Sequence, residues 1–213
     1  NYEVRYAVAK CLLDNEQFTE CLDVLEGSNI LPNEGASRGR VIYRQATLMK
    51  AIEFYRQKDF ESARQFVDKA RLWPENLGVG RPYEPDERIE DFMEAECLKQ
   101  VAGRKDSSQE LYQKVISYSE NSARGRSSVD YVYLLTLRRL GKESQINEYL
   151  NSWRKSSTED PVLKWCENML RNNLSAARQV DKLVDTGIEG GTPWNPKRTD
   201  PVFELIKTLG YVL

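Results

Sequence analysis

The fold is decided by the stretch from Ala51 to Pro74, which reads AIEFYRQKDFESARQFVDKARLWP. Its apolar residues recur at the spacing of an amphipathic helix on both sides of a turn at Lys58-Asp59. Ala63 supplies a small side chain near the start of the second helix, where the two helices of a hairpin would cross closely. Pro74 then ends that helix, because proline has no N–H to donate and disfavours helix in the residue before it. The stretch therefore predicts a helical hairpin.

The same pattern recurs along the chain, and no segment shows the sustained alternation of a strand. We expect five helical hairpins, at about residues 2–27, 41–72, 86–118, 128–154 and 160–185. A linker and a capping helix are expected to follow in 186–213. The apolar face of the first helix is expected to consist of Val4, Ala7, Val8, Cys11 and Leu12. The sequence thus predicts an all-α protein built from repeats in the segment 1–185.

One marker residue identifies the repeat in each hairpin. It is small or apolar and stands near the start of the second helix, and successive markers are 42, 45, 38 and 31 residues apart. The five markers are Cys21, Ala63, Ser108, Ile146 and Ala177. The spacings scatter around and above the 34-residue period of a tetratricopeptide (TPR) repeat, and the excess lies in linkers, where a repeat array tolerates insertions.

The second hairpin resembles a TPR repeat through Lys58-Asp59-Phe60-Glu61-Ser62-Ala63-Arg64, as do the turns at Val101-Ala102-Gly103-Arg104 and Leu140-Gly141-Lys142. The resemblance covers roughly residues 2 to 185, although Ile146 and Trp165 stand where TPR repeats usually have small residues. It implies a right-handed α-solenoid of about five hairpins with a C-terminal closing helix. The first helix of each hairpin would line a concave groove.

A narrower resemblance lies in the segment Leu72 to Tyr83, which reads LWPENLGVGRPY. It is similar to an inter-repeat segment of long bacterial TPR proteins whose upstream part is a β-rich domain of unknown function, often likened to carbohydrate-enzyme modules. The segment from Asp200 to Gly210 resembles the closing helix of many TPR proteins. The chain starts at Asn1 without Met, and a helical pattern already runs at Tyr2, so we expect a fragment of a longer protein. The resemblance to a closing helix implies that the truncation is at the N-terminal end only.

The composition excludes several kinds of site. The chain has no His, which removes the usual base of Ser and Cys nucleophiles and the usual nitrogen ligand of zinc. The four cysteines are too scattered for a CxxC metal site, and they are expected to be reduced and buried, which would suit the cytoplasm. We therefore expect a non-enzymatic chain with no catalytic residue, no metal and no cofactor. The compartment stays open.

Charge and hydropathy restrict the partners in the same way. The 31 Lys and Arg residues are balanced by 33 Asp and Glu residues, so the formal net charge of -2 gives no general attraction to nucleic acid. No apolar run reaches the roughly 18 residues that cross a bilayer. We expect neither nucleic-acid binding nor membrane insertion.

Two further patterns are given a structural interpretation. Gly78-Val79-Gly80 lacks the third glycine and the preceding strand of a dinucleotide site, so it predicts a loop. The carboxylates Glu87, Glu90 and Asp91, and the pair Glu94 and Glu96, are expected on a solvated helix face rather than in a catalytic pair.

The expected function is therefore binding of a peptide, a partner protein or the missing N-terminal part of its own chain. The expected peptide groove combines aromatic and cationic side chains, which suit an acidic peptide or a peptide bound by its C-terminal carboxylate: Tyr6, Lys10, Gln45, Ile52, Tyr55, Arg56, Lys99, Tyr131, Leu135 and Arg138. Packing of Tyr6 and Tyr131 between repeats is an equal alternative. A second candidate contact surface is the loop with Trp73, Arg81 and Tyr83. The alternative function is an accessory module for an upstream carbohydrate-active or carbohydrate-binding domain.

Overall fold

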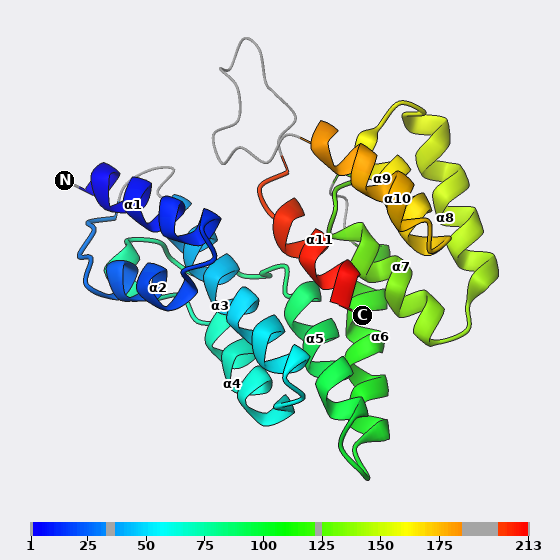
Figure 1. Ribbon diagram of the computed structural model, residues 1–213. Helices are drawn as coiled ribbons and strands as arrows, with labels where there is room; N and C mark the ends of the chain where they lie inside the picture. Colours follow the sequence, from blue (N-terminus) through cyan, green and yellow to red (C-terminus); the bar gives the residue numbers. More distant parts are fainter. Residues whose placement is uncertain (1, 33–36, 122–124, 185–199, 213) are drawn as a thin grey trace. The chain divides into compact units, whose positions relative to one another are not determined.

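The computed structural model describes residues 2–32, 37–121, 125–184 and 200–212 (Figure 1). Across these ranges the chain forms eleven α-helices and two short 3-10 helices, and no strand. The helices pack sequentially in pairs, which confirms the expected all-α class. None of the helices in the described ranges has the length and apolarity that a membrane crossing would require.

The helices lie at the hairpin segments expected from the sequence, but three of them extend beyond the expected bounds. Five pairs are followed by one closing helix: α1 (Tyr2–Asp14) with α2 (Phe18–Glu26), α3 (Arg38–Arg56) with α4 (Phe60–Ala70), α5 (Arg88–Lys99) with α6 (Lys105–Asn121), α7 (Asp130–Arg139) with α8 (Glu143–Ser156), α9 (Pro161–Leu170) with α10 (Leu174–Val180), and then α11 (Phe203–Val212). Helix α3 begins at residue 38 rather than 41, α6 ends at 121 rather than 118, and α8 ends at 156 rather than 154. The 3-10 helices are η1 (Glu75–Leu77) and η2 (Asp181–Leu183).

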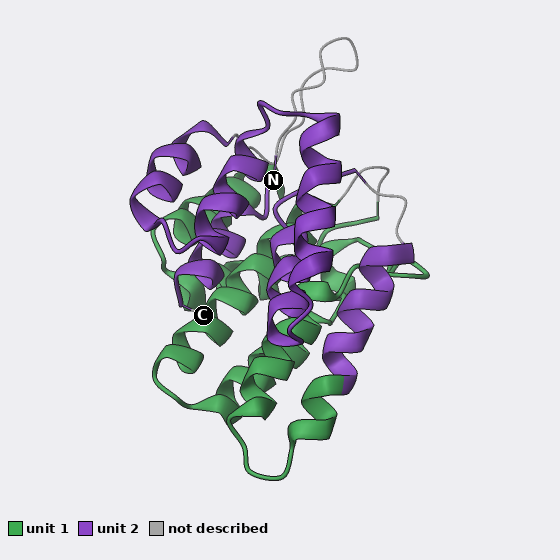
Figure 2. Cartoon of the chain, turned by 90° about the vertical axis from the view of Figure 1, so that its right-hand side faces the viewer, with its two compact units in different colours: residues 1–109 green, residues 110–213 purple. Residues whose placement is uncertain are grey.

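The chain divides into two compact units, residues 1–109 and 110–213, which Figure 2 shows in different colours. The boundary lies inside α6, so it falls within the third expected hairpin rather than between hairpins. The first unit holds the hairpins α1–α2 and α3–α4 together with α5. The second holds α7 to α11 and most of α6.

All five turns within the hairpins share one backbone feature. Each contains a residue in the left-handed region, with φ between 57° and 76°: Glu16, Lys58, Gly103, Gly141 and Asn172. In four of the five turns, the N–H of the following residue donates to the carbonyl five residues earlier, as when Asp59 N–H donates to Phe54 O at 3.0 Å. This bond closes a helix by the Schellman motif and directs the chain into the next helix.

The left-handed residues show that the marker residues occupy one structural position. Each marker lies five residues after the left-handed residue of its turn. All five are buried: Cys21, Ala63, Ser108, Ile146 and Ala177. A common turn followed at a fixed distance by a buried residue means that the five hairpins share a structural register, although their spacing along the chain varies.

The α3–α4 hairpin shows how small residues allow the helices to approach. Ala51, Ala63 and Ala70 are fully buried, and the rings of Phe54 and Phe66 stack with centroids 5.3 Å apart. Asp59 begins α4 by accepting a hydrogen bond from Ser62 N–H at 3.0 Å, which satisfies one of the free donors of the helix start. The packing predicted from the quoted stretch is therefore confirmed.

The first helix differs from its expected packing. Its buried residues are Tyr6, Ala9 and Leu13, on the face opposite the expected one. Four of the five residues expected on the apolar face, Val4, Ala7, Val8 and Cys11, are exposed instead. Cys11 is also the exception among the four free cysteines, because Cys21, Cys97 and Cys166 are buried as expected.

Candidate functional site

Half of the residues expected to line a groove do not face solvent. The buried ones are Tyr6, Gln45, Ile52, Tyr131 and Leu135. Tyr6 lies so close to Gly39 that a Cβ added to this glycine would stand 2.7 Å from the tyrosine hydroxyl. Tyr131 packs its ring against Trp165 with centroids 4.9 Å apart. The prediction that these five side chains contact a ligand is therefore corrected, because they pack in the interior. For the two tyrosines, interior packing was the alternative left open by the sequence.

The other five expected groove residues keep some exposure. Arg56 and Lys99 are exposed, whereas Lys10, Tyr55 and Arg138 are half-buried. Lys10 pairs with Asp14, and Nη2 of Arg138 donates to the carbonyl of Leu170. In this set, Arg56 and the half-buried Tyr55 stand next to each other on α3 and remain candidates for contact with a partner.

In the second unit, the closing helix α11 covers the side chains of the first helices α7 and α9. Phe203 meets the ring of Trp165 edge to face, with centroids 5.1 Å apart. Gly210 approaches so closely that an added Cβ would lie 3.0 Å from Tyr131 Cε1 and 3.1 Å from Met169 Cε. The surface that the sequence assigned to a ligand is thus occupied here by a helix of the chain itself.

Asp200 anchors the segment that leads into α11. Its carboxylate accepts two hydrogen bonds from Ser128, one from the backbone N–H at 2.7 Å and one from the hydroxyl at 2.9 Å. Ser128 lies two residues before the first residue of α7, so the carboxylate lies at the positive end of that helix. Both residues are buried. The Asp200 carboxylate at the start of α7 and the Phe203 ring against Trp165 together hold α11 in place.

The fit of α11 leaves two buried polar atoms without a protein partner. Within the described residues, neither Trp165 Nε1 nor the Tyr211 hydroxyl has a hydrogen-bond partner. Arg178 places its guanidinium 5.6 Å from the centroid of the Tyr211 ring. A buried donor without an acceptor costs free energy, about 1–3 kcal/mol. The surface therefore offers at least one donor that α11 does not use.

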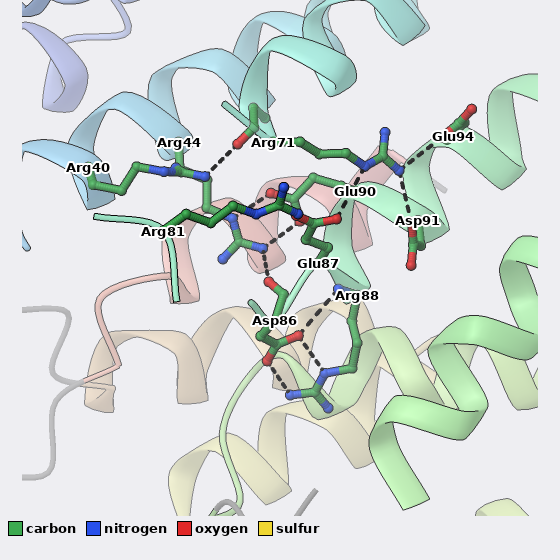
Figure 3. A network of polar contacts seen from close by, with 11 residues as sticks. Arg40, Arg44, Arg71, Arg81, Asp86, Glu87, Arg88, Glu90, Asp91 and Glu94 are labelled. Atoms are coloured by element: carbon green, nitrogen blue, oxygen red, sulfur yellow. Dashed lines mark hydrogen bonds and ion pairs between the residues drawn. The ribbon is translucent and has the colours of Figure 1, made fainter. Parts of the chain in front are cut away.

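In the first unit, a network of arginines and carboxylates joins α3, α4 and α5 (Figure 3). Nε and Nη2 of Arg44 donate to the two carboxylate oxygens of Glu90, and Nη2 also donates to the carbonyl of Asp86 at 2.8 Å. The Glu90 side chain is only 1% exposed. Burial opposes the charge of Arg44, but the attraction of Glu90 outweighs burial and the pKa of Arg44 is raised.

Arg71 forms a second node of this network at the end of α4. Its Nη2 donates to Asp91 at 2.9 Å and to Glu94 at 2.8 Å, both on α5, and its Nη1 pairs with Asp68 at 2.9 Å. Asp86 pairs with Arg88 two residues later. The expected solvated face is therefore wrong for Glu90 and for Glu96, which are buried. Sequence reasoning missed these pairs because their partners lie up to 46 residues away.

Arg40 stands apart because its guanidinium forms no ion pair within the described residues, although Glu90 and Glu87 attract it at longer range. It is 6% exposed, and its guanidinium lies 4.6 Å from the centroid of the Trp73 ring. Its Nη2 donates to the carbonyl of Ala70 at 2.6 Å, whereas Nε and Nη1 have no partner. Burial and the neighbouring charge of Arg44 lower the pKa of Arg40 to about 10.

The loop proposed as the alternative contact surface is held firmly at its base and open at its tip. Asn76 Nδ2 donates to the carbonyls of Leu25 and Ser28, each at 2.9 Å. Gly78 has φ of +69° and lies where an added Cβ would stand 2.8 Å from Ile30 O, so both conformation and space require glycine. Trp73 is half-buried, Arg81 pairs with Glu87 at 3.0 Å, and Tyr83 is 98% exposed.

The comparisons leave the family open. Comparing the chain with models of protein families, with curated proteins and with solved structures gives no match. Among the residues that the structure describes, no group of three or more His, Cys, Asp or Glu side chains could hold a metal ion.

Proposed function

We propose that the chain is a protein-binding module that takes up a helical segment on the first helices of its hairpins. One observation carries this proposal: the first helices of the second unit already hold such a segment, α11. The contacts are of the kind that recognise a peptide, because they combine a buried carboxylate on a helix start, an edge-to-face aromatic pair and a close approach at Gly210.

We propose further that the hairpins form a right-handed α-solenoid of TPR type. Support comes from the left-handed residue shared by all five turns and from the buried marker five residues later. In arrays of this kind each repeat contacts its neighbours, and the stacked repeats create an extended binding surface.

The binding surface is tested by adding the α11 segment as a separate peptide. A protease site is placed between residues 185 and 199 of the full chain, and the cut protein is mixed with a labelled synthetic peptide covering 200–213. We expect the peptide to exchange with the resident helix and to raise the fluorescence anisotropy of its label. The matched control peptide carries Gly210→Leu, which should bind at least tenfold more weakly because its side chain would clash with Tyr131 and Met169.

Two outcomes would contradict the proposal. In one, the cut protein takes up neither peptide at any concentration while circular dichroism shows that it remains folded. In the other, the Gly210→Leu peptide binds as tightly as the native peptide, which would mean that binding does not use the surface of α7 and α9.

A further inference from the structure

The closing segment contacts the first helices of the second unit at three positions. The Asp200 carboxylate accepts two hydrogen bonds from Ser128, and both residues are buried. Phe203 is fully buried and meets the Trp165 ring edge to face. A Cβ added to Gly210 would stand 3.3 Å from the same tryptophan. Asp200 lies three residues before Phe203, and Gly210 lies seven residues after it, two turns along the same face of the helix.

We propose that the surface of α7 and α9 selects partner helices that carry the same chemistry at the same spacing. The pattern, here called the anchor pattern, consists of a carboxylate, an aromatic ring three residues later and a small residue seven residues after the ring. This inference rests on the proposed function and adds to it the chemistry of the partner. Because α11 is a helix already held on this surface, its contacts identify the groups that the surface accommodates.

The carboxylate is the polar part of the anchor pattern. Its Oδ2 accepts from the Ser128 N–H at 2.7 Å, and its Oδ1 accepts from the Ser128 hydroxyl at 2.9 Å. The start of α7 adds a helix dipole that favours a negative charge here. An amide has one oxygen and no charge, so it would not reproduce both interactions. Since hydrogen bonds to a charged group are the stronger ones, the surface should discriminate Asp from Asn.

The other two positions of the pattern restrict shape and size. The rings of Phe203 and Trp165 are inclined at 75°, an edge-to-face arrangement that an aliphatic side chain would lose. At Gly210, an added Cβ would lie 3.0 Å from Tyr131 Cε1 and 3.1 Å from Met169 Cε. These distances are shorter than ordinary van der Waals contacts, so alanine requires a small shift and a large side chain does not fit.

Tyr211 follows the anchor pattern and marks a position that favours a purely apolar ring. Its hydroxyl is buried and has no hydrogen-bond partner within the described residues. Its ring centroid lies 5.6 Å from the Arg178 guanidinium, a contact that phenylalanine would keep. A buried hydroxyl without a partner opposes binding. A partner helix with Phe at this position should therefore bind at least as tightly as α11.

The pattern is tested with the cut protein and the labelled 200–213 peptide, using unlabelled variants of the peptide as competitors and fluorescence anisotropy as the measurement. Asp200→Asn should bind about tenfold more weakly, because it loses a buried, charged hydrogen bond. The matched control is Glu204→Gln, which removes the same charge from a side chain that is 56% exposed and should change binding less than about twofold. Phe203→Leu should bind about fivefold more weakly. Tyr211→Phe should bind as tightly as the native peptide or more tightly.

The outcomes distinguish the anchor pattern from the proposed function on which it rests. If the native peptide does not exchange into the folded cut protein, both are contradicted. If the native peptide binds and Asp200→Asn is weakened no more than Glu204→Gln, the anchor pattern alone is wrong. Weaker binding of Tyr211→Phe would mean that the bound helix lies differently from α11, and this result would overturn the pattern as well.

Discussion

At the scale of single residues, the ion pair of Arg44 and Glu90 shows how strongly the fold depends on matched buried charges. Removing one partner of a buried pair leaves the other charge without compensation in a medium that solvates it poorly. We expect Glu90→Gln to lower the free energy of unfolding by about 3 kcal/mol or more. Urea denaturation of the variant and the wild type measures this difference.

The matched control for that measurement is Glu61→Gln. Glu61 also pairs with an arginine, Arg64, but its side chain is 73% exposed. Loss of an exposed pair should change the free energy of unfolding by less than about 1 kcal/mol. Equal losses in the two variants would show that burial does not decide the energy of these pairs.

The buried thiols make stability depend on alkaline pH. Burial raises the pKa of Cys21 and of Cys97 to about 12, from an ordinary value of 9.0. The folded state therefore keeps these thiols protonated where the unfolded state ionises them. Their contribution to stability is fully present below pH 9 and is lost as the pH rises toward 12. Burial raises the pKa of Tyr131 and Tyr149 as well, which adds to the loss above pH 10.

We accordingly expect the urea midpoint to fall between pH 8 and pH 10.5. Cys21→Ala/Cys97→Ala should show a smaller fall over the same interval, because two of the groups that ionise on unfolding are absent. Arg40 acts in the opposite direction between about pH 10 and pH 12.5, since its cation is disfavoured in the folded state. An unchanged midpoint between pH 8 and 10.5 would contradict the burial of the thiols.

At the scale of elements, each hairpin depends on the small or apolar residue five positions after its left-handed turn residue. Ala63 is fully buried at this point in α4. Ala63→Glu would bury a charge and overpack the crossing, and we expect it to destabilise the protein by about 3 kcal/mol or more. Thermal unfolding followed by circular dichroism measures the effect.

Gln65→Glu provides the control for Ala63→Glu. It introduces the same residue two positions later on α4, at an exposed site. This variant should unfold within a few degrees of the wild type. If Ala63→Glu keeps the wild-type melting temperature, the crossing of α3 and α4 does not depend on a small residue there.

At the scale of the whole molecule, the proposed binding role can be separated from folding. Near the end of α3, Tyr55 is half-buried and Arg56 is exposed. The double variant Tyr55→Ala/Arg56→Glu should therefore still fold. We expect the double variant to lose at least one partner recovered by the wild type in a peptide-array or pull-down screen. Circular dichroism checks that both proteins are folded.

The loop variant Tyr83→Ala is the matched comparison, because Tyr83 is almost fully exposed on a different surface. The contrary outcome is a partner that binds the α3 double variant as tightly as the wild type and fails to bind Tyr83→Ala. That result would assign the binding site to the loop from Trp73 to Tyr83 instead of the first helices.

The sequence by itself determined the helices, their turns and the position that the marker residues share in the hairpins. These features depend on residues close together in the chain. Helical spacing of apolar residues identifies each helix, Gly103 and Gly141 permit a left-handed turn, and Asp59 caps α4. The markers such as Ala63 could be found because their distance from the turn is fixed by a single helix.

Only the tertiary structure decided which faces are covered and which charges are paired. Tyr6 and Ile52 have the composition of groove residues, yet they are buried, because burial depends on the segment that packs over them. Glu90 was expected in solvent, but Arg44 lies 46 residues away and meets it only after α3 and α5 are in place. Helical periodicity shows that a face is apolar. What covers that face, as α11 covers Tyr131, depends on distant parts of the chain.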